Sequence, residues 1–141
     1  MGMALILGAI LPLQATVNGR LSRAVSSPVV AAFISFAVGT VALLIYLVVS
    51  RQLQIPRQAV QSPWWVWSGG LLGTFFVAGI VMLLPRLGVA LAFSLVLSGQ
   101  MLAAMIFDHI GFLGVSIREI SLGRIAGALL LIAGIILIRK F

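Results

Sequence analysis

Charged residues divide the chain into five long stretches that contain no Asp, Glu, Lys or Arg. These stretches are 1–19, 24–50, 58–85, 87–107 and 125–138. A helix that crosses the hydrocarbon core of a bilayer needs about 20 predominantly apolar residues. The last stretch is short, but Arg124 and Arg139 can lengthen it by reaching toward the headgroups. The pattern predicts an all-α integral membrane protein with five transmembrane helices.

The composition supports this fold class, because 62% of the residues are hydrophobic and only 8% are charged. A soluble domain carries about 25% charged residues to cover its surface. No predicted loop is long enough to hold a soluble domain, so we expect 1–141 to form a single transmembrane domain. The expected helices cover about 3–20, 28–50, 63–84, 87–108 and 122–139. Ser27-Pro28 and Ser62-Pro63 have the residue types of an N-cap followed by a first helical residue, and Ser121 can cap the last helix.

The charged residues favour the membrane as the partner and argue against nucleic acid. The net charge is +7, but the nine basic residues stand singly or in pairs between apolar stretches, as interfacial anchors do. With no Cys and one His, the sequence predicts no metal site. It contains no phosphate-binding loop, zinc motif or nucleophile elbow, so we expect neither a cofactor nor an enzyme. The N-terminus lacks the basic segment of a signal peptide, and we expect it to form a retained helix.

Two amides in the first predicted helix are candidates for a binding site. Gln14 and Asn18 are four residues apart and share a helix face, shortly after Pro12, where we expect a kink or a local opening. Polar side chains at membrane depth are costly and therefore mark functional positions. The alternative is that both amides form hydrogen bonds to a neighbouring helix and only hold the bundle together.

The fourth predicted helix contains three further candidates for substrate binding. Ser94 and Ser98 lie on one face, and Gln100 lies on nearly the opposite side. A Ser hydroxyl in a membrane helix usually bonds its own backbone four residues back, whereas the larger Gln100 cannot be satisfied so locally. Ser35 and Thr40 of the second helix are weaker candidates for the same reason.

The fourth helix ends with Asp108 and His109, which could relay protons or couple an ion near neutral pH. Their position near the membrane interface instead favours a solvated helix end, with the carboxylate close to headgroups or to an Arg. No carboxylate lies well inside a predicted span. A neutral or anionic solute therefore suits this protein better than a cation.

Small residues are expected where membrane helices pack closely. Gly69 and Gly73 form a GxxxG pattern in the third helix, Gly123 and Gly127 form another in the fifth, and Gly134 continues that face. Each pattern fits either an interface between subunits or packing within one chain.

Several segments resemble the YdcZ-like family of the drug/metabolite transporter superfamily. They are LPLQATVNGRLSRAVSSPVVAAFISFAVGT, SPWWVWSGGLLGTFFV, PRLGVALAFSLVLSGQMLAAMIFDHIGFLG and the closing SLGRIAGALLLIAGIILI. The resemblance implies a five-helix half of a ten-helix, inverted-repeat transporter of unknown substrate in a bacterial inner membrane. The positions that match the family's motifs are Gln14, Asn18, Arg20, Pro85, Gln100, Asp108 and His109. Related small multidrug resistance proteins have an essential Glu in their first helix, where this sequence reads Leu11, Pro12, Leu13 and Gln14.

The basic residues do not favour one membrane orientation. With five spans, one side holds Arg51, Arg57, Arg118 and Arg124, and the other holds Arg20, Arg23, Arg86, Arg139 and Lys140. The positive-inside rule needs a larger difference than this, so the sequence predicts dual topology. We expect alternating access in an antiparallel homodimer, or with an oppositely oriented homologous partner, and an unknown small-molecule substrate. The alternative function is a non-transporting membrane assembly or lipid-interacting protein.

Overall fold

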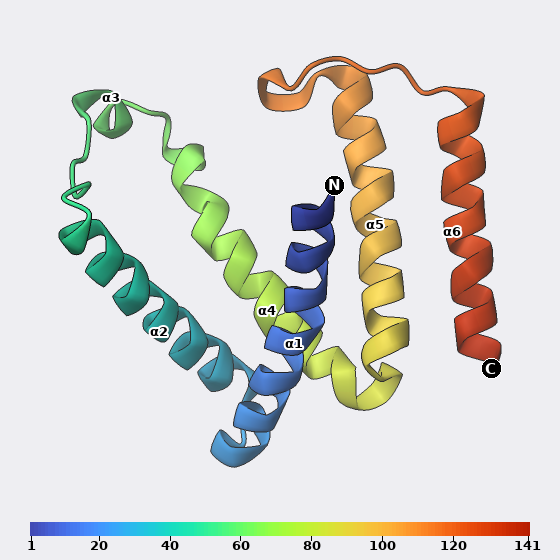
Figure 1. Cartoon of the computed structure of the whole chain (residues 1–141), viewed down its shortest axis with the longest axis horizontal. Helices are drawn as coiled ribbons and strands as arrows, with labels where there is room; N and C mark the ends of the chain where they lie inside the picture. The colour runs from blue at the N-terminus through green and yellow to red at the C-terminus, as the bar shows by residue number, and fades with distance from the viewer. The chain divides into compact units, whose positions relative to one another are not determined.

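The computed structural model describes all residues 1–141, and every regular element in it is a helix (Figure 1). The elements are α1 (Gly2–Val25), α2 (Pro28–Val49), α3 (Arg57–Val60), the 3-10 helix η1 (Trp64–Ser68), α4 (Gly69–Leu87), α5 (Val89–Ile110), the 3-10 helix η2 (Phe112–Gly114) and α6 (Leu122–Lys140). Five helical segments are long and apolar enough to cross a membrane, with η1 and α4 counted as one. The predicted all-α fold with five candidate spans is confirmed.

The chain forms two compact units, Met1–Arg86 and Leu87–Phe141. In the first unit, α1 and α2 form an antiparallel hairpin that spreads apart with distance from its turn (Figure 1). Ser26 makes the turn in a left-handed conformation, and its N–H donates to the Ser22 carbonyl. Ser27 Oγ then accepts a hydrogen bond from the Val30 N–H at 3.3 Å, ahead of Pro28. The predicted N-cap at Ser27 is confirmed.

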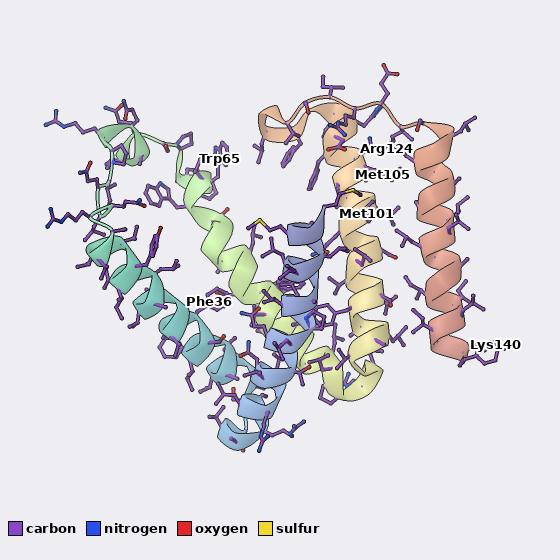
Figure 2. The ribbon with its side chains drawn as sticks, viewed as in Figure 1. Phe36, Trp65, Met101, Met105, Arg124 and Lys140 are labelled. Atoms are coloured by element: carbon purple, nitrogen blue, oxygen red, sulfur yellow. The ribbon has the colours of Figure 1, made fainter.

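Small side chains form the interior of the first unit between α1 and α2, while Val77, Ile80 and Val81 of α4 are its larger buried side chains. Ala15 of α1 and Ala31 and Ala32 of α2 are buried, as expected where membrane helices approach closely. Ala32 also packs with Val77 and Ala78 of α4. A second contact between α2 and α4 comes from Phe36, whose ring atom Cζ would lie 3.5 Å from a Cβ at Gly73. Figure 2 labels Phe36 on the stretch of α2 that faces α4.

The second unit is the antiparallel pair α5 and α6 (Figure 1). Gly111 ends α5 with a φ of 63°, and a Cβ at this position would lie 2.9 Å from the Ile117 side chain. Glycine is therefore required here both for its backbone conformation and for its size. Ser121 Oγ accepts a hydrogen bond from the Arg124 N–H at 3.3 Å and starts α6, which confirms the predicted cap.

The ends of several helices differ from those expected. α1 is continuous through Pro12, so the expected local opening is absent, and it extends beyond Arg20 and Arg23 to Val25. α4 likewise includes Pro85, although the predicted helix ended at residue 84. The break before α5 lies instead at Gly88, whose φ of 73° is a conformation that glycine adopts readily. The short helices α3 and η2 lie outside the predicted spans and were not expected, whereas η1 lies within the predicted helix 63–84 but has 3-10 geometry.

Most large apolar side chains are exposed on the isolated chain, and α6 has no buried residue. Among the α1 side chains, Leu5 is 77% exposed and Leu13 is 64% exposed. Such surfaces are stable in hydrocarbon but not in water. These faces therefore require lipid or another protein chain to cover them.

Candidate functional site

A groove of about 240 Å³ lies between α1 and α2 near the middle of both helices. Gln14 from α1 and Ser35 and Thr40 from α2 supply its polar groups, and Phe36, Gly39 and Leu43 complete it. Gln14 and Gly39 stand at nearly equal distances along the chain from Ser26, so they lie at the same level of the hairpin. Gln14, a candidate from the sequence, thus lines a groove together with two hydroxyl groups.

Asn18 lies one helical turn from Gln14, on the side of the Ser26 turn, and is only 3% exposed. Its Nδ2 has no hydrogen-bond partner within the chain. An unsatisfied buried polar group costs about 1–3 kcal/mol. The Asn18 amide is therefore a buried donor that lacks a partner within the chain, and a bound water would satisfy it.

Ser94 and Ser98 lie in a different place, between α5 and α6. They share a groove of about 220 Å³ with Gly134. Ser94 Oγ donates to the Ala90 carbonyl at 2.8 Å, as expected for a hydroxyl satisfied by its own helix. The buried Ser98 Oγ has no such partner. These two serines thus belong to the second unit and line a groove of their own.

Gln100 is exposed and lines neither of these grooves. It lies on the side of α5 roughly opposite to Ser98, two residues away at about 100° per residue. That Gln100 faces the same cavity as Gln14 and Asn18 stays a prediction.

Asp108, in the last turn of α5, forms an ion pair with Arg124 in the first turn of α6. Arg124 Nη1 also donates to the Arg118 carbonyl at 3.1 Å, and the Arg118 N–H donates to the Asp108 carbonyl at 2.9 Å. The Asp108 carboxylate is therefore paired with an Arg. The sequence analysis gave such a pairing as the alternative to proton relay or ion coupling. His109 is exposed at the same helix end.

The glycines of the two GxxxG patterns have different surroundings. Only Gly73 faces another helix of the chain, through Phe36. A Cβ at Gly69, Gly127 or Gly134 would meet nothing within 4 Å, and one at Gly123 would meet only Ser121 Oγ at 3.9 Å. Gly73 therefore packs within the chain, while the glycine face of α6 is open.

Ser35 and Thr40 were weaker candidates in the sequence analysis, but the structure places both in the same groove as Gln14. Two signals were available in the sequence. Gly39 leaves space next to Thr40, and positions 14 and 39 are almost symmetric about the Ser26–Ser27 turn. No group of three or more His, Cys, Asp or Glu side chains is arranged to hold a metal ion.

Comparison with known proteins identifies the family. A family model described as "Putative inner membrane exporter, YdcZ" matches residues 1–137. The chain belongs to the YdcZ family. It is similar to "Inner membrane protein YdcZ" of Escherichia coli (strain K12), with 28% identity over 131 residues that cover 92% of this chain and 87% of that protein. No solved structure matches the chain.

Membership of the YdcZ family confirms the resemblance that the sequence motifs predicted. The chain is a multi-pass inner-membrane protein with five candidate transmembrane helices. Its family is one of exporters rather than of enzymes. In this family member, the α1–α2 groove is a polar site near the middle of two spans.

Proposed function

We propose that this YdcZ-family protein exports a small polar solute by alternating access, with the α1–α2 groove as part of the solute site. One observation carries the proposal. Gln14 lies in the middle of a membrane-spanning helix and lines a groove with the hydroxyl-bearing Ser35 and Thr40. An amide at this depth needs a hydrogen-bonding partner, and water or a solute in the groove supplies one.

The groups around this groove favour a neutral or anionic solute over a cation. Amides and hydroxyls both donate and accept hydrogen bonds, so they suit a solute with mixed polar groups. Asp108 and Glu119 are the only acids of the chain, and neither lines the groove. A cation in the groove would therefore have no carboxylate beside it.

The groove supports a dimeric arrangement. Its volume of about 240 Å³ is below the roughly 300–1,000 Å³ of typical small-molecule sites. A second groove from an inverted copy, or from an oppositely oriented homologous partner, would bring the site into that range. Transporters built from inverted repeats bind their substrates at the repeat interface near the midplane. In such a dimer Gln14 of both copies would supply two amides to one cavity, and the buried Asn18, one helical turn away, is proposed as a further solute contact.

Three further residues are proposed to serve this transport cycle. Asp108 and His109, at the loop end of α5, are proposed to couple it to protons or another ion, since a carboxylate and an imidazole can both bind a proton or a cation. Gln100 is proposed as an additional solute contact from α5.

The proposal is tested by screening solutes for thermal stabilisation of the purified protein, because a ligand that binds only the folded state raises its stability. A solute that stabilises should also be transported into proteoliposomes, and Gln14→Leu should abolish both effects. Thr16→Val is the matched control, because the Thr16 hydroxyl already donates to the Pro12 carbonyl. The alternative is a non-transporting assembly or lipid-interacting protein. It would be supported if no solute stabilised or crossed the membrane with the parent protein and if Gln14→Leu lowered the folding stability.

A further inference from the structure

A second groove between α5 and α6, of about 470 Å³, lies on a side away from Gly134. One wall consists of Leu91 and Leu95 of α5 and of Leu87, the last residue of α4. The wall on α6 includes Ile132, Ile136 and Arg139. Ser98 closes it on α5. The groove thus has an aliphatic interior and one cationic residue.

The groove runs from one end of the helix pair to the middle of α5. Leu91 and Ser98 are separated by roughly 10 Å along α5 at 1.5 Å per residue, and Leu87, the last residue of α4, lines the groove beyond the start of α5. The hydrocarbon core of a bilayer is about 30 Å thick, so the groove extends from one membrane surface to about the midplane. A partner helix would cross both leaflets, whereas an acyl chain of one lipid occupies a single leaflet.

The residues of the groove also favour an acyl chain over a helix. Apart from Ser98 and Arg139, its lining consists of Leu and Ile. Helices pack closely in membranes on small residues, and these lie on another side of α6, at Gly127 and Gly134. A flexible hydrocarbon chain fills a Leu- and Ile-lined channel without requiring close backbone approach.

The open end of the groove carries positive charge. Arg139 lines it in the last turn of α6, and Lys140 follows. Figure 2 shows Lys140 at the free end of α6, the opposite end from Arg124. Basic residues at a membrane surface attract anionic lipid headgroups. The charge therefore lies where the phosphate of a lipid would stand if its acyl chain filled the groove.

We propose that this groove holds one acyl chain of an anionic phospholipid, with its phosphate at Arg139. The site is separate from the α1–α2 groove and does not depend on the proposed transport function. The deep end, at Ser98, receives the alkyl tail and makes no polar contact with it.

Native mass spectrometry of protein released from nanodiscs of phosphatidylethanolamine and phosphatidylglycerol tests the proposal. Arg139→Gln should lower the retention of phosphatidylglycerol about fivefold, the effect of one interfacial cation. Arg57→Gln, which removes a charge from α3, should leave retention unchanged. Leu91→Trp should fill the groove and remove the lipid, while Leu102→Trp, at an exposed position of α5 outside the groove, should not.

Three outcomes would overturn the proposal. Equal losses in Arg139→Gln and Arg57→Gln would show a general charge effect. A loss in Ser98→Ala as large as in Arg139→Gln would show an occupant with a polar group at its deep end. The third outcome uses the absence of Cys from the chain, which allows single-cysteine cross-linking in membranes. A disulfide dimer through Ile136→Cys, formed as readily as one through Gly127→Cys, would show that a second copy covers the groove.

Discussion

Arg124, in the first turn of α6, donates a hydrogen bond from Nη2 to Asp108 Oδ2 in the last turn of α5. The pair closes the loop end of these two antiparallel helices. Arg124 and Arg118 add two hydrogen bonds that involve main-chain atoms of the same loop. The loop from Gly111 to Ser121 is thus held at both ends by the ion pair and by the cap at Ser121.

We expect Asp108→Asn and Arg124→Gln each to lower the free energy of unfolding. The double variant should lose less than the sum of the two single losses. Both side chains are 30% exposed, so the coupling energy should be about 0.5–1 kcal/mol. A double-mutant cycle from denaturation in detergent micelles measures it. His109→Gln is the control, because no ion pair is formed by His109. Strictly additive effects would contradict a stabilising pair.

A second prediction compares two glycines that the sequence treats alike. Gly127→Leu should weaken dimerisation and leave the stability of the single chain unchanged, since a Cβ there meets nothing within 4 Å of the chain. Gly73→Leu should lower the stability of the single chain and leave dimerisation unchanged, because the Leu side chain would clash with the Phe36 ring. Cross-linking in membranes reports the dimer, and thermal unfolding reports the fold.

An unchanged dimer fraction in Gly127→Leu would remove this glycine face from the proposed subunit interface. If Gly73→Leu dissociated the dimer without a loss of stability, α4 would become the interface instead.

The fold was largely predictable from the sequence because hydrocarbon imposes a strict requirement on helix length and polarity. The five charge-free stretches correspond to the five candidate spans. Helix ends were less predictable. Arg20 and Arg23 end an apolar stretch but not α1, since a helix can continue into the headgroup region, and Pro85 remains within α4 because the break lies at Gly88.

The site was only partly predictable, because the sequence identifies polar residues at depth but not which residues face each other. It singled out Gln14 and Asn18 but ranked Ser35 and Thr40 as weak, and only the hairpin geometry joins three of these in one groove. The sequence predicts Ser98 as a solute contact as well, and the structure places it in a groove between α5 and α6. Gly73 packs within the chain and Gly69 does not. The difference comes from Phe36, whose contact with Gly73 is not visible in the sequence because the two residues are far apart along the chain.

The third prediction concerns membrane orientation. The basic residues are nearly balanced between the two sides, so reporter fusions to the C-terminus should show both locations. Two added Lys residues in the 51–57 segment should drive the chain to one orientation. A single clean orientation of the unmodified chain would exclude an antiparallel homodimer and require an oppositely oriented partner protein.

The fourth prediction concerns the central claim, that the α1–α2 groove is a polar cavity at mid-membrane. The chain has no Cys, so single cysteines can be introduced at Gln14, Thr40 and Val41 and exposed to a membrane-impermeant thiol reagent. Gln14 and Thr40 line the groove, whereas Val41 does not and is 56% exposed on the surface of the chain. All three positions lie near the middle of a span, so only contact with water should distinguish them. The proposed cavity predicts that Gln14→Cys and Thr40→Cys react and Val41→Cys does not; equally unreactive cysteines at all three positions would contradict it.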